Sequence, residues 1–429
     1  MSDSPRWSTV KRAHLTANKI KKKVAQENFV GKSMKENMSE WTASIALCFQ
    51  KGVSATLNQS DDTTSPDTPL AAEVLQTQVE VNGDEFTFEE FAPRLFSRVR
   101  KVLEIDPIEH SAVLGVDHSA ITTDLRLIST DQAAGKSMAF FMFTSDMRYC
   151  IKSCNSEDVN CLLDIVSSYT EHCEQHPDTL LPRFLGLYSI VFGKERICLV
   201  VQSNIFAGYR AVSEKYDLKG SMYGRKSSPN ELAKGENAVL KDIDFLSRGR
   251  CLPFKSADDR ASFLRKLQAD AAWLRTSGLM DYSLLVGFVK DFGDKPISRH
   301  IVDMLRLNPK LPEQPYDVAY IGIVDILMKF NWFKKCEEVV LNPVLGDVSC
   351  ANPRKYAERM LEFAEHVTAD VVDESWKQTK LKMVTGKLIP TTREFGRKDA
   401  FQALKRAAPF LLIAVGAVSV SVYRQRFRR

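Results

Sequence analysis

The stretch Gly278-Leu-Met-Asp-Tyr-Ser-Leu-Leu-Val-Gly-Phe288 places one carboxylate, Asp281, at the mouth of an apolar run with the composition of a β-strand. Upstream, apolar residues recur at helical spacing: Phe263, Leu267, Ala271 and Leu274. Ser256 or Ser262 is a candidate N-cap for this helix, and Gly278 is placed to end it. A carboxylate held between a helix, a turn and a strand either caps the turn or takes part in chemistry. The rest of the chain decides between these readings.

Composition favours a large folded unit with appendages. The 429 residues are 44% hydrophobic and 26% charged, which is ordinary for a soluble protein, and the length suits two lobes. The net charge of +5 is modest, but basic residues cluster at 19–23 and 424–429, which indicates an anionic membrane as partner rather than nucleic acid. Nine cysteines at irregular spacing, without an N-terminal secretory signal, favour reduced thiols in a cytosolic domain.

The C-terminal end departs from this pattern. Residues 407–423 contain no charged residue and are bounded by Lys405-Arg406 and Arg424. As a helix they would span about 25 Å, which suffices for a thin bilayer with snorkelling flanks. A buried terminal helix is the alternative, but the run is apolar on every side. We expect a transmembrane tail anchor in an internal membrane, the mitochondrial outer membrane or endoplasmic reticulum rather than the plasma membrane, with the remainder in the cytosol.

The order of predicted elements favours an α+β fold with antiparallel sheets. Residues 1–72 combine a basic segment with a polar, Pro-containing linker, and the compact domain is expected to follow. The predicted elements are a helix at 86–103, a hairpin of 139–143 with 148–151, a helix at 158–169, a hairpin of 187–191 with 197–201, and strands at 282–288 and 320–324. Strands and helices do not alternate regularly, which argues against a parallel doubly wound sheet.

Candidates exist for each part of a phosphoryl-transfer site, which needs a cation on the phosphates, an acid that holds magnesium and a base that orients the attacking hydroxyl. Lys152 ends a predicted strand, downstream of a loop containing Gly135 and Ser137 that is placed to cover phosphates. Asp281 precedes one apolar strand and Asp325 follows another, so two strands can present both acids in one cleft. Ordinary surface charge is the alternative reading of Lys152.

Several apparent motifs fail on inspection. Gly135-Lys-Ser137 resembles the end of a Walker A loop, but Thr130 stands where the motif requires a glycine. Asp291-Phe-Gly293 spells a protein-kinase signature without a His-Arg-Asp loop before it, and is predicted to be a polar turn. His172 and Cys173 lack the paired ligand spacing of a zinc site.

Ordered motifs in this chain resemble the phosphatidylinositol phosphate kinase family over residues 78–365. They are Tyr216-Asp-Leu-Lys-Gly-Ser221, Leu279-Met-Asp-Tyr-Ser-Leu-Leu-Val-Gly287, Tyr320-Ile-Gly-Ile-Val-Asp-Ile-Leu327, Lys334-Lys335 and Tyr356-Ala-Glu-Arg359, with weaker matches at Leu240-Lys-Asp-Ile-Asp-Phe245 and Asn204. The resemblance implies a two-lobed lipid kinase that uses ATP and Mg²⁺. It places the kinase domain at 73–365, an activation loop at 325–356, a linker at 366–406 and the anchor at 407–423.

The resemblance also implies roles for single residues. Asp281 is expected to be the catalytic aspartate, with Lys219 pointing toward the phosphates and Asp217 shaping the site. Asp325 is expected to hold Mg²⁺. The residues expected to bind ATP are Lys152, Gly135, Ser137 and Asn204.

The activation loop carries the expected substrate and membrane contacts. Trp332, Lys334 and Lys335 suit insertion at a lipid surface and attraction of phosphoinositide headgroups; a helix with two surface lysines is the alternative. Glu337 resembles the type I branch, which favours phosphatidylinositol 4-phosphate as substrate and the 4,5-bisphosphate as product. Kinases for the 5- or 3-monophosphate isomer, and a membrane-tethered phosphoinositide-binding pseudokinase, stay open as alternatives, the last because Met138 and Ala139 depart from the family's phosphate-covering loop. A homodimer is also left open.

Overall fold

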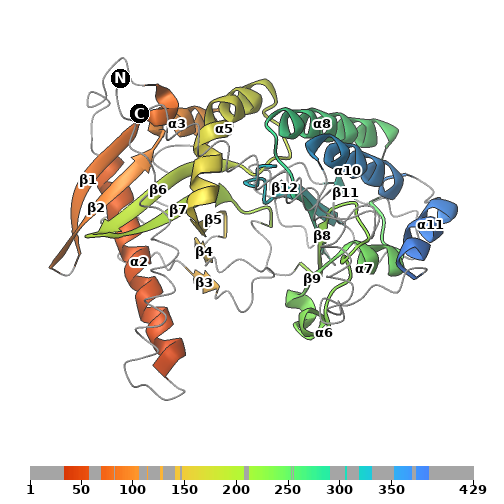
Figure 1. The fold of residues 1–429 in the computed structure, drawn as a ribbon, viewed down its shortest axis with the longest axis horizontal. Helices are drawn as coiled ribbons and strands as arrows, with labels where there is room; N and C mark the ends of the chain where they lie inside the picture. The colour runs from red at the N-terminus through yellow and green to blue at the C-terminus, as the bar shows by residue number, and fades with distance from the viewer. Residues whose placement is uncertain are drawn as a thin grey trace, which may run out of the picture.

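The computed structural model describes residues 33–57, 69–81, 83–105, 114, 126–128, 141–144, 147–206, 212–252, 254, 256–289, 305–306, 318–330, 352–369 and 373–385. These residues form two sheets with flanking helices, seven strands in one sheet and five in the other (Figure 1). The fold is α+β and its sheets are antiparallel apart from one short parallel pair, β8 with β9.

The first sheet has the strand order β1-β2-β6-β7-β5-β4-β3. Its strands are β1 (Val74–Val81), β2 (Asp84–Phe91), β3 (Arg126–Ile128), β4 (Phe141–Phe143), β5 (Tyr149–Cys154), β6 (Phe184–Phe192) and β7 (Glu195–Ser203). Helices α2 (Ser33–Leu57), α3 (Pro93–Val102) and α5 (Ser156–Gln175), with the 3₁₀ turn η2 (Leu70–Ala72), pack around this sheet. Both hairpins predicted from the sequence are confirmed, as β4 with β5 and β6 with β7.

The second sheet has the order β11-β12-β10-β8-β9. Its strands are β8 (Glu214–Leu218), β9 (Val239–Leu240), β10 (Ser283–Val289), β11 (Leu305–Arg306) and β12 (Val318–Val324). The elements around it are α6 (Pro229–Leu232), η3 (Gly235–Asn237), α7 (Asp242–Ser247), α8 (Ala257–Thr276), α10 (Pro353–Val367) and α11 (Glu374–Thr385). Helices α8 and α10 lie against each other (Figure 1). Helix α11 falls within the range expected as a linker, and its Trp376 packs against Phe363 of α10.

Local sequence explains where helix α8 begins and ends. Ser256 caps α8, because its side chain accepts a hydrogen bond from the backbone N–H of Asp259. Gly278 follows the helix with φ +69°, the left-handed conformation that glycine adopts without steric cost. The predicted start and stop of this helix are therefore confirmed, with Ser256 rather than Ser262 as the N-cap.

The helix predicted at 86–103 is wrong in its first half. Residues up to Phe91 form strand β2, and the helix begins only at Pro93. Phe86 and Phe88 are both buried, and this spacing of two places them on one face of a strand. Phe88 packs against Tyr188 and Phe49 of α2, so burial between the sheet and a helix overrides the local helical pattern.

The expected transmembrane helix requires correction. In the part of the chain that the structure describes, no helix combines the length and apolar character needed to span a bilayer. The segment 407–423 itself lies outside the described residues. The tail anchor and the internal-membrane localisation derived from it are therefore not retained.

Candidate active site

Three strands deliver side chains to one edge of the five-stranded sheet. In the antiparallel register, Leu218 of β8 lies opposite Leu284 of β10, and Ser283 of β10 lies opposite Val324 of β12. β8 and β12 therefore end where β10 begins. The residues just beyond these ends are Lys219 after β8, Asp281 before β10 and Asp325 after β12. The register thus brings the ends of the strands next to Asp281 and Asp325 to the same edge of the sheet.

Both carboxylates sit on unusual backbone. Asp281 has φ +63° and Asp325 has φ +59°, in the left-handed region that non-glycine residues rarely occupy. The segment after Asp325 folds back along the turn before β10: Met280 N–H donates to Met328 O at 3.0 Å, and Phe330 N–H donates to Gly278 O at 2.9 Å. This pairing holds both turns together. Backbone of this kind clusters at functional sites, where the surrounding structure stabilises it.

Each carboxylate is paired with one ammonium group. Lys219 Nζ lies 2.8 Å from both the backbone O and Oδ1 of Asp281. Lys152 Nζ lies 2.9 Å from Asp325 Oδ1. Lys152 belongs to β5 of the other sheet, where its register partners are Phe141 and Val200. The site therefore lies between the two sheets and needs both of them.

The Lys152–Asp325 pair shifts the pKa of each partner toward its ionised form. Desolvation by the surrounding protein raises the pKa of Asp325, but the positive charge and hydrogen bond of Lys152, with the charge of Lys219, bring it below its usual value. Burial lowers the pKa of Lys152, but the charge and hydrogen bond of Asp325, with smaller contributions from neighbouring groups, together raise it above its usual value. Both groups are therefore ionised at neutral pH.

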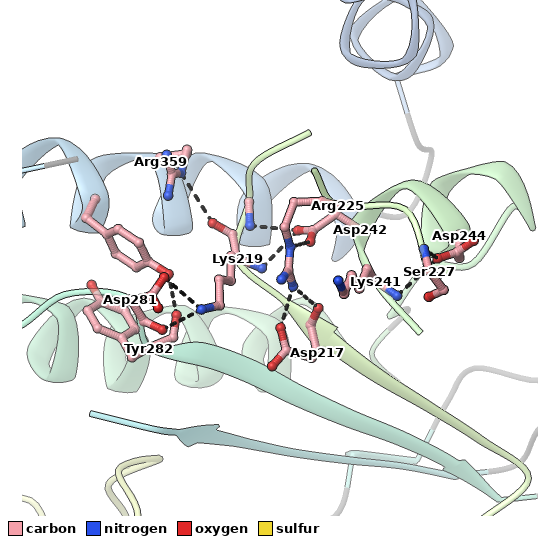
Figure 2. A network of polar contacts seen from close by, with 12 residues as sticks. Asp217, Lys219, Arg225, Ser227, Lys241, Asp242, Asp244, Asp281, Tyr282 and Arg359 are labelled. Atoms are coloured by element: carbon pink, nitrogen blue, oxygen red, sulfur yellow. Dashed lines mark hydrogen bonds and ion pairs between the residues drawn. The ribbon is translucent and has the colours of Figure 1, made fainter. Parts of the chain in front are cut away.

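Helix α10 supports the same edge from above the sheet (Figure 2). The Tyr356 hydroxyl donates to the backbone O of Tyr282, which is next to Asp281. The rings of Tyr356 and Tyr282 pack edge to face, with 4.6 Å between their centroids. The Arg359 guanidinium lies 4.7 Å from the centre of the Tyr356 ring, and its Nε donates to Lys219 O at 3.3 Å. One helix thus contacts the backbone beside both members of the Lys219–Asp281 pair.

Two other predicted site residues have partners within the protein. Asp217 Oδ1 accepts a hydrogen bond from the guanidinium of Arg225. Asn204 holds the turn before β5: its Nδ2 donates to Met147 O at 2.8 Å and its Oδ1 accepts from Phe206 N–H at 3.1 Å. The remaining predicted site residues lie outside the described part of the chain: Gly135, Ser137, Trp332, Lys334, Lys335 and Glu337.

The structure adds residues to which the sequence assigned no role. Arg225 and Asp242 form a buried ion pair beneath Lys219, with Arg225 Nε 2.7 Å from Asp242 Oδ2. Arg359 and Tyr356 contact the pair from α10. Asp242, Tyr356 and Arg359 all fall inside motifs quoted above, which is the signal that could have identified them. Arg225 lies just after such a motif.

Asp325 suits a hard cation. Its side chain is 59% exposed at the mouth of the site, and a carboxylate oxygen is the ligand that Mg²⁺ prefers. Among the described residues, no group of three or more His, Cys, Asp or Glu side chains is arranged to hold a metal ion. A magnesium ion bound through one or two carboxylates together with nucleotide phosphates does not need such a group.

Comparison with known proteins matches this architecture to one family. The family model described as phosphatidylinositol-4-phosphate 5-kinase matches residues 123–306 and 304–367. A probable phosphatidylinositol phosphate kinase of Dictyostelium discoideum is 34% identical over 203 residues, which cover 47% of this chain and 28% of the relative. The phosphatidylinositol 4-phosphate 5-kinase its3 of Schizosaccharomyces pombe is 26% identical over 66% of this chain and 46% of its own length.

A 4-kinase relative is matched over a larger share of its own length than the two relatives above. The human phosphatidylinositol 5-phosphate 4-kinase type-2 alpha is 30% identical over 330 residues, 66% of this chain and 78% of the relative. The chain spans less than half the length of the Dictyostelium and Schizosaccharomyces relatives. The family model runs over β8, β10 and β12, the strands that carry Lys219, Asp281 and Asp325. The chain therefore belongs to the phosphatidylinositol phosphate kinase family.

Proposed function

We propose that this chain transfers the γ-phosphate of ATP to a hydroxyl of the inositol ring of a phosphatidylinositol monophosphate. The observation that carries the proposal is the pairing of Lys152 with Asp325 across the two sheets, beside the pairing of Lys219 with Asp281 at the end of the five-stranded sheet. Phosphoryl transfer requires little covalent chemistry from the protein, because positioning and charge neutralisation supply most of the acceleration. Two acids paired with two cations at the end of the five-stranded sheet meet that requirement.

Asp281 is the proposed general base. Its carboxylate is about one third exposed, so an inositol hydroxyl can approach it. The ammonium group of Lys219 orients this carboxylate and places positive charge beside the attacking oxygen. A proton transfer of this kind accelerates a reaction by roughly 10²- to 10⁴-fold.

Lys152 and Asp325 are the proposed nucleotide side of the site. Mg²⁺ bound with ATP would neutralise charge on its phosphates, and Asp325 is the residue that would hold it. Lys152 is then available to a phosphate oxygen, because its ammonium group no longer has to neutralise Asp325 alone. In the structure the ion pair holds Lys152 Nζ 2.9 Å from Asp325 Oδ1.

For the substrate we propose phosphatidylinositol 4-phosphate, phosphorylated at the 5-hydroxyl. The description of the matching family model and the resemblance of Glu337 to the type I branch support this isomer. A second candidate is the 4-kinase reaction on phosphatidylinositol 5-phosphate, which is favoured by the match to the human type-2 alpha enzyme over 78% of its length.

A radiolabel assay tests the proposal. The full chain is incubated with labelled ATP, Mg²⁺ and vesicles containing each monophosphorylated phosphatidylinositol in turn, and the labelled position of the product is determined. Label at the 5-position of phosphatidylinositol 4-phosphate is expected. Label at the 4-position of the 5-phosphate isomer would favour the second candidate. Label on no isomer, beside an active related kinase, would instead indicate a phosphoinositide-binding scaffold.

Asp281→Asn is the decisive variant in this assay. Its turnover should fall by at least about 10²-fold because the amide cannot accept the hydroxyl proton, while its circular dichroism and melting temperature stay close to those of the wild type. Asp258→Asn, at an exposed position in the first turn of α8, serves as the control and should retain activity. Retained turnover in Asp281→Asn would exclude this residue as the base.

A further inference from the structure

A fully buried carboxylate, Asp242, lies directly behind the lysine of the proposed site. It stands at the start of α7, and its Oδ1 accepts hydrogen bonds from the backbone N–H of Lys219 at 2.9 Å and of Gly220 at 2.8 Å. Its Oδ2 accepts from Arg225 Nε at 2.7 Å. Three donors converge on one carboxylate, which compensates the cost of burying its charge.

Arg225 connects this carboxylate to the end of β8. Its second guanidinium nitrogen donates to both the side chain and the backbone O of Asp217, two residues before Lys219 (Figure 2). The backbone O of Arg225 in turn accepts from Ile243 N–H of α7 at 3.0 Å. The end of the strand, the turn that follows it and the start of α7 therefore form one hydrogen-bonded unit.

The position of the Lys219 ammonium group depends on this unit. The location of a lysine nitrogen is set by its backbone and by four rotatable side-chain bonds, so a shift of the backbone changes which side-chain conformations reach Asp281. The backbone N–H of Lys219 is bound by Asp242 and its backbone O by Arg359. A displacement of about 1 Å at a reacting group can reduce a rate by roughly 10²-fold.

We propose that Asp242 is a positioning residue of the kinase reaction: by binding the backbone N–H groups of Lys219 and Gly220 it presents the Lys219 ammonium group to Asp281. The inference rests on the proposed function. Asp242 touches neither substrate nor nucleotide in this scheme, and it acts through the turn after β8. Arg225 serves as its counter-charge: burial raises the pKa of Asp242, and the positive charge and hydrogen bond of Arg225 act against that rise.

Asp244 provides a matched control on the same short helix. It is also buried, and its Oδ2 accepts from Ser227 N–H at 2.8 Å and Lys241 N–H at 3.3 Å. Neither of these donors is Lys219 or Gly220. Asp242→Asn and Asp244→Asn therefore remove one buried charge each from positions two residues apart, and only the first loosens the turn that carries Lys219.

The test compares both variants with the wild type by steady-state kinetics and by hydrogen–deuterium exchange of the peptide covering residues 217–222. We expect kcat of Asp242→Asn to fall by about 10- to 100-fold, with the KM for ATP changed by less than about threefold, and the amides of residues 219 and 220 to exchange faster. Asp244→Asn should keep both the wild-type kcat and the wild-type exchange of this peptide. An unchanged kcat in Asp242→Asn, or an equal fall in both variants, would overturn the inference.

Two further outcomes also bear on the inference: a variant that does not fold, and a wild-type chain without lipid kinase activity. Should Asp242→Asn fail to fold, Asp242→Glu retains the charge for Arg225 and shifts the carboxylate by one methylene; a wild-type kcat in this variant would overturn the inference, and a reduced kcat would support it. A wild-type chain that phosphorylates none of the lipids would defeat the proposed function. In that case unchanged exchange in Asp242→Asn overturns the positioning role and faster exchange supports it.

Discussion

Among single residues, Asp325 has a pKa that its neighbours lower. Desolvation by the surrounding protein raises the pKa of Asp325, but the charge and hydrogen bond of Lys152, together with the charge of Lys219, bring it below the usual 3.8. A carboxyl group whose pKa is lowered on folding stabilises the folded state at pH values above its unfolded pKa. That contribution is lost as the pH falls through the folded pKa.

Replacement of Asp325 should therefore have a pH-dependent cost. The free energy of unfolding of the wild type should exceed that of Asp325→Asn by a constant amount at pH 5–7, and the difference should shrink as the pH falls below about 4. Urea titrations between pH 3 and 7 measure this difference. Asp164→Asn, which breaks a more exposed pair with Lys329, should cost less than about 1 kcal/mol. A difference for Asp325→Asn that already declines at pH 6 would contradict the assignment.

At the scale of elements, the turn after β8 is packed against helix α10. Gly220 has φ +66°, and a Cβ at this position would meet Arg359 O at 3.0 Å and Phe363 Cβ at 3.1 Å. Gly224 has nearly the same φ, +65°, and a Cβ there would meet nothing within 4 Å. The two glycines therefore separate backbone strain from the close approach of a helix.

Alanine substitutions at these glycines should differ. Gly224→Ala should cost about 1–2 kcal/mol, the strain of a left-handed alanine. Gly220→Ala should cost about 1–3 kcal/mol more, because α10 must move away from the turn, and it should also lower kcat by displacing Lys219. Urea unfolding and the lipid kinase assay measure the two effects. Equal stability of the two variants would show that α10 tolerates the added methyl group.

At the scale of the whole molecule, a buried carboxylate links the two sheets and their helices. Asp270 of α8 lies 2.7 Å from His172 Nε2 of α5, accepts from Thr179 Oγ1 at 2.5 Å, and accepts from Leu180 N–H at 2.8 Å. The backbone O of Leu180 accepts from Ile323 N–H of β12 at 2.7 Å. This hub joins α5 and the segment before β6 to α8 and to β12, the strand that leads to Asp325.

Asp270→Ala should destabilise the whole fold. The substitution leaves several buried groups without their partner, and each buried donor left unpaired costs about 1–3 kcal/mol. Trp273 stacks on His172 at 5.5 Å, so tryptophan fluorescence during urea unfolding reports on this region. Glu174→Ala, which removes a surface pair with Arg98, should cost less than about 1 kcal/mol. Similar losses in the two variants would exclude the hub as a major contributor.

Much of the local structure follows from the sequence. The polar cap at Ser256 and the stop at Gly278 set the limits of α8, and strand composition placed both hairpins. The helix predicted over 86–103 failed because β2 and α3 are both amphipathic and adjoin without a polar break. The packing of Phe88 between Tyr188 and α2 distinguishes the strand periodicity of β2 from the helical periodicity of α3.

The sequence by itself determined that Asp281 and Asp325 flank apolar strands, since this depends only on the order of residues along the chain. The tertiary structure alone decided their partners. Lys152 reaches Asp325 from the other sheet, and Asp242 reaches the turn of Lys219 from α7. These contacts join residues far apart in the chain, and they depend on how the sheets and helices pack. No local spacing encodes that arrangement.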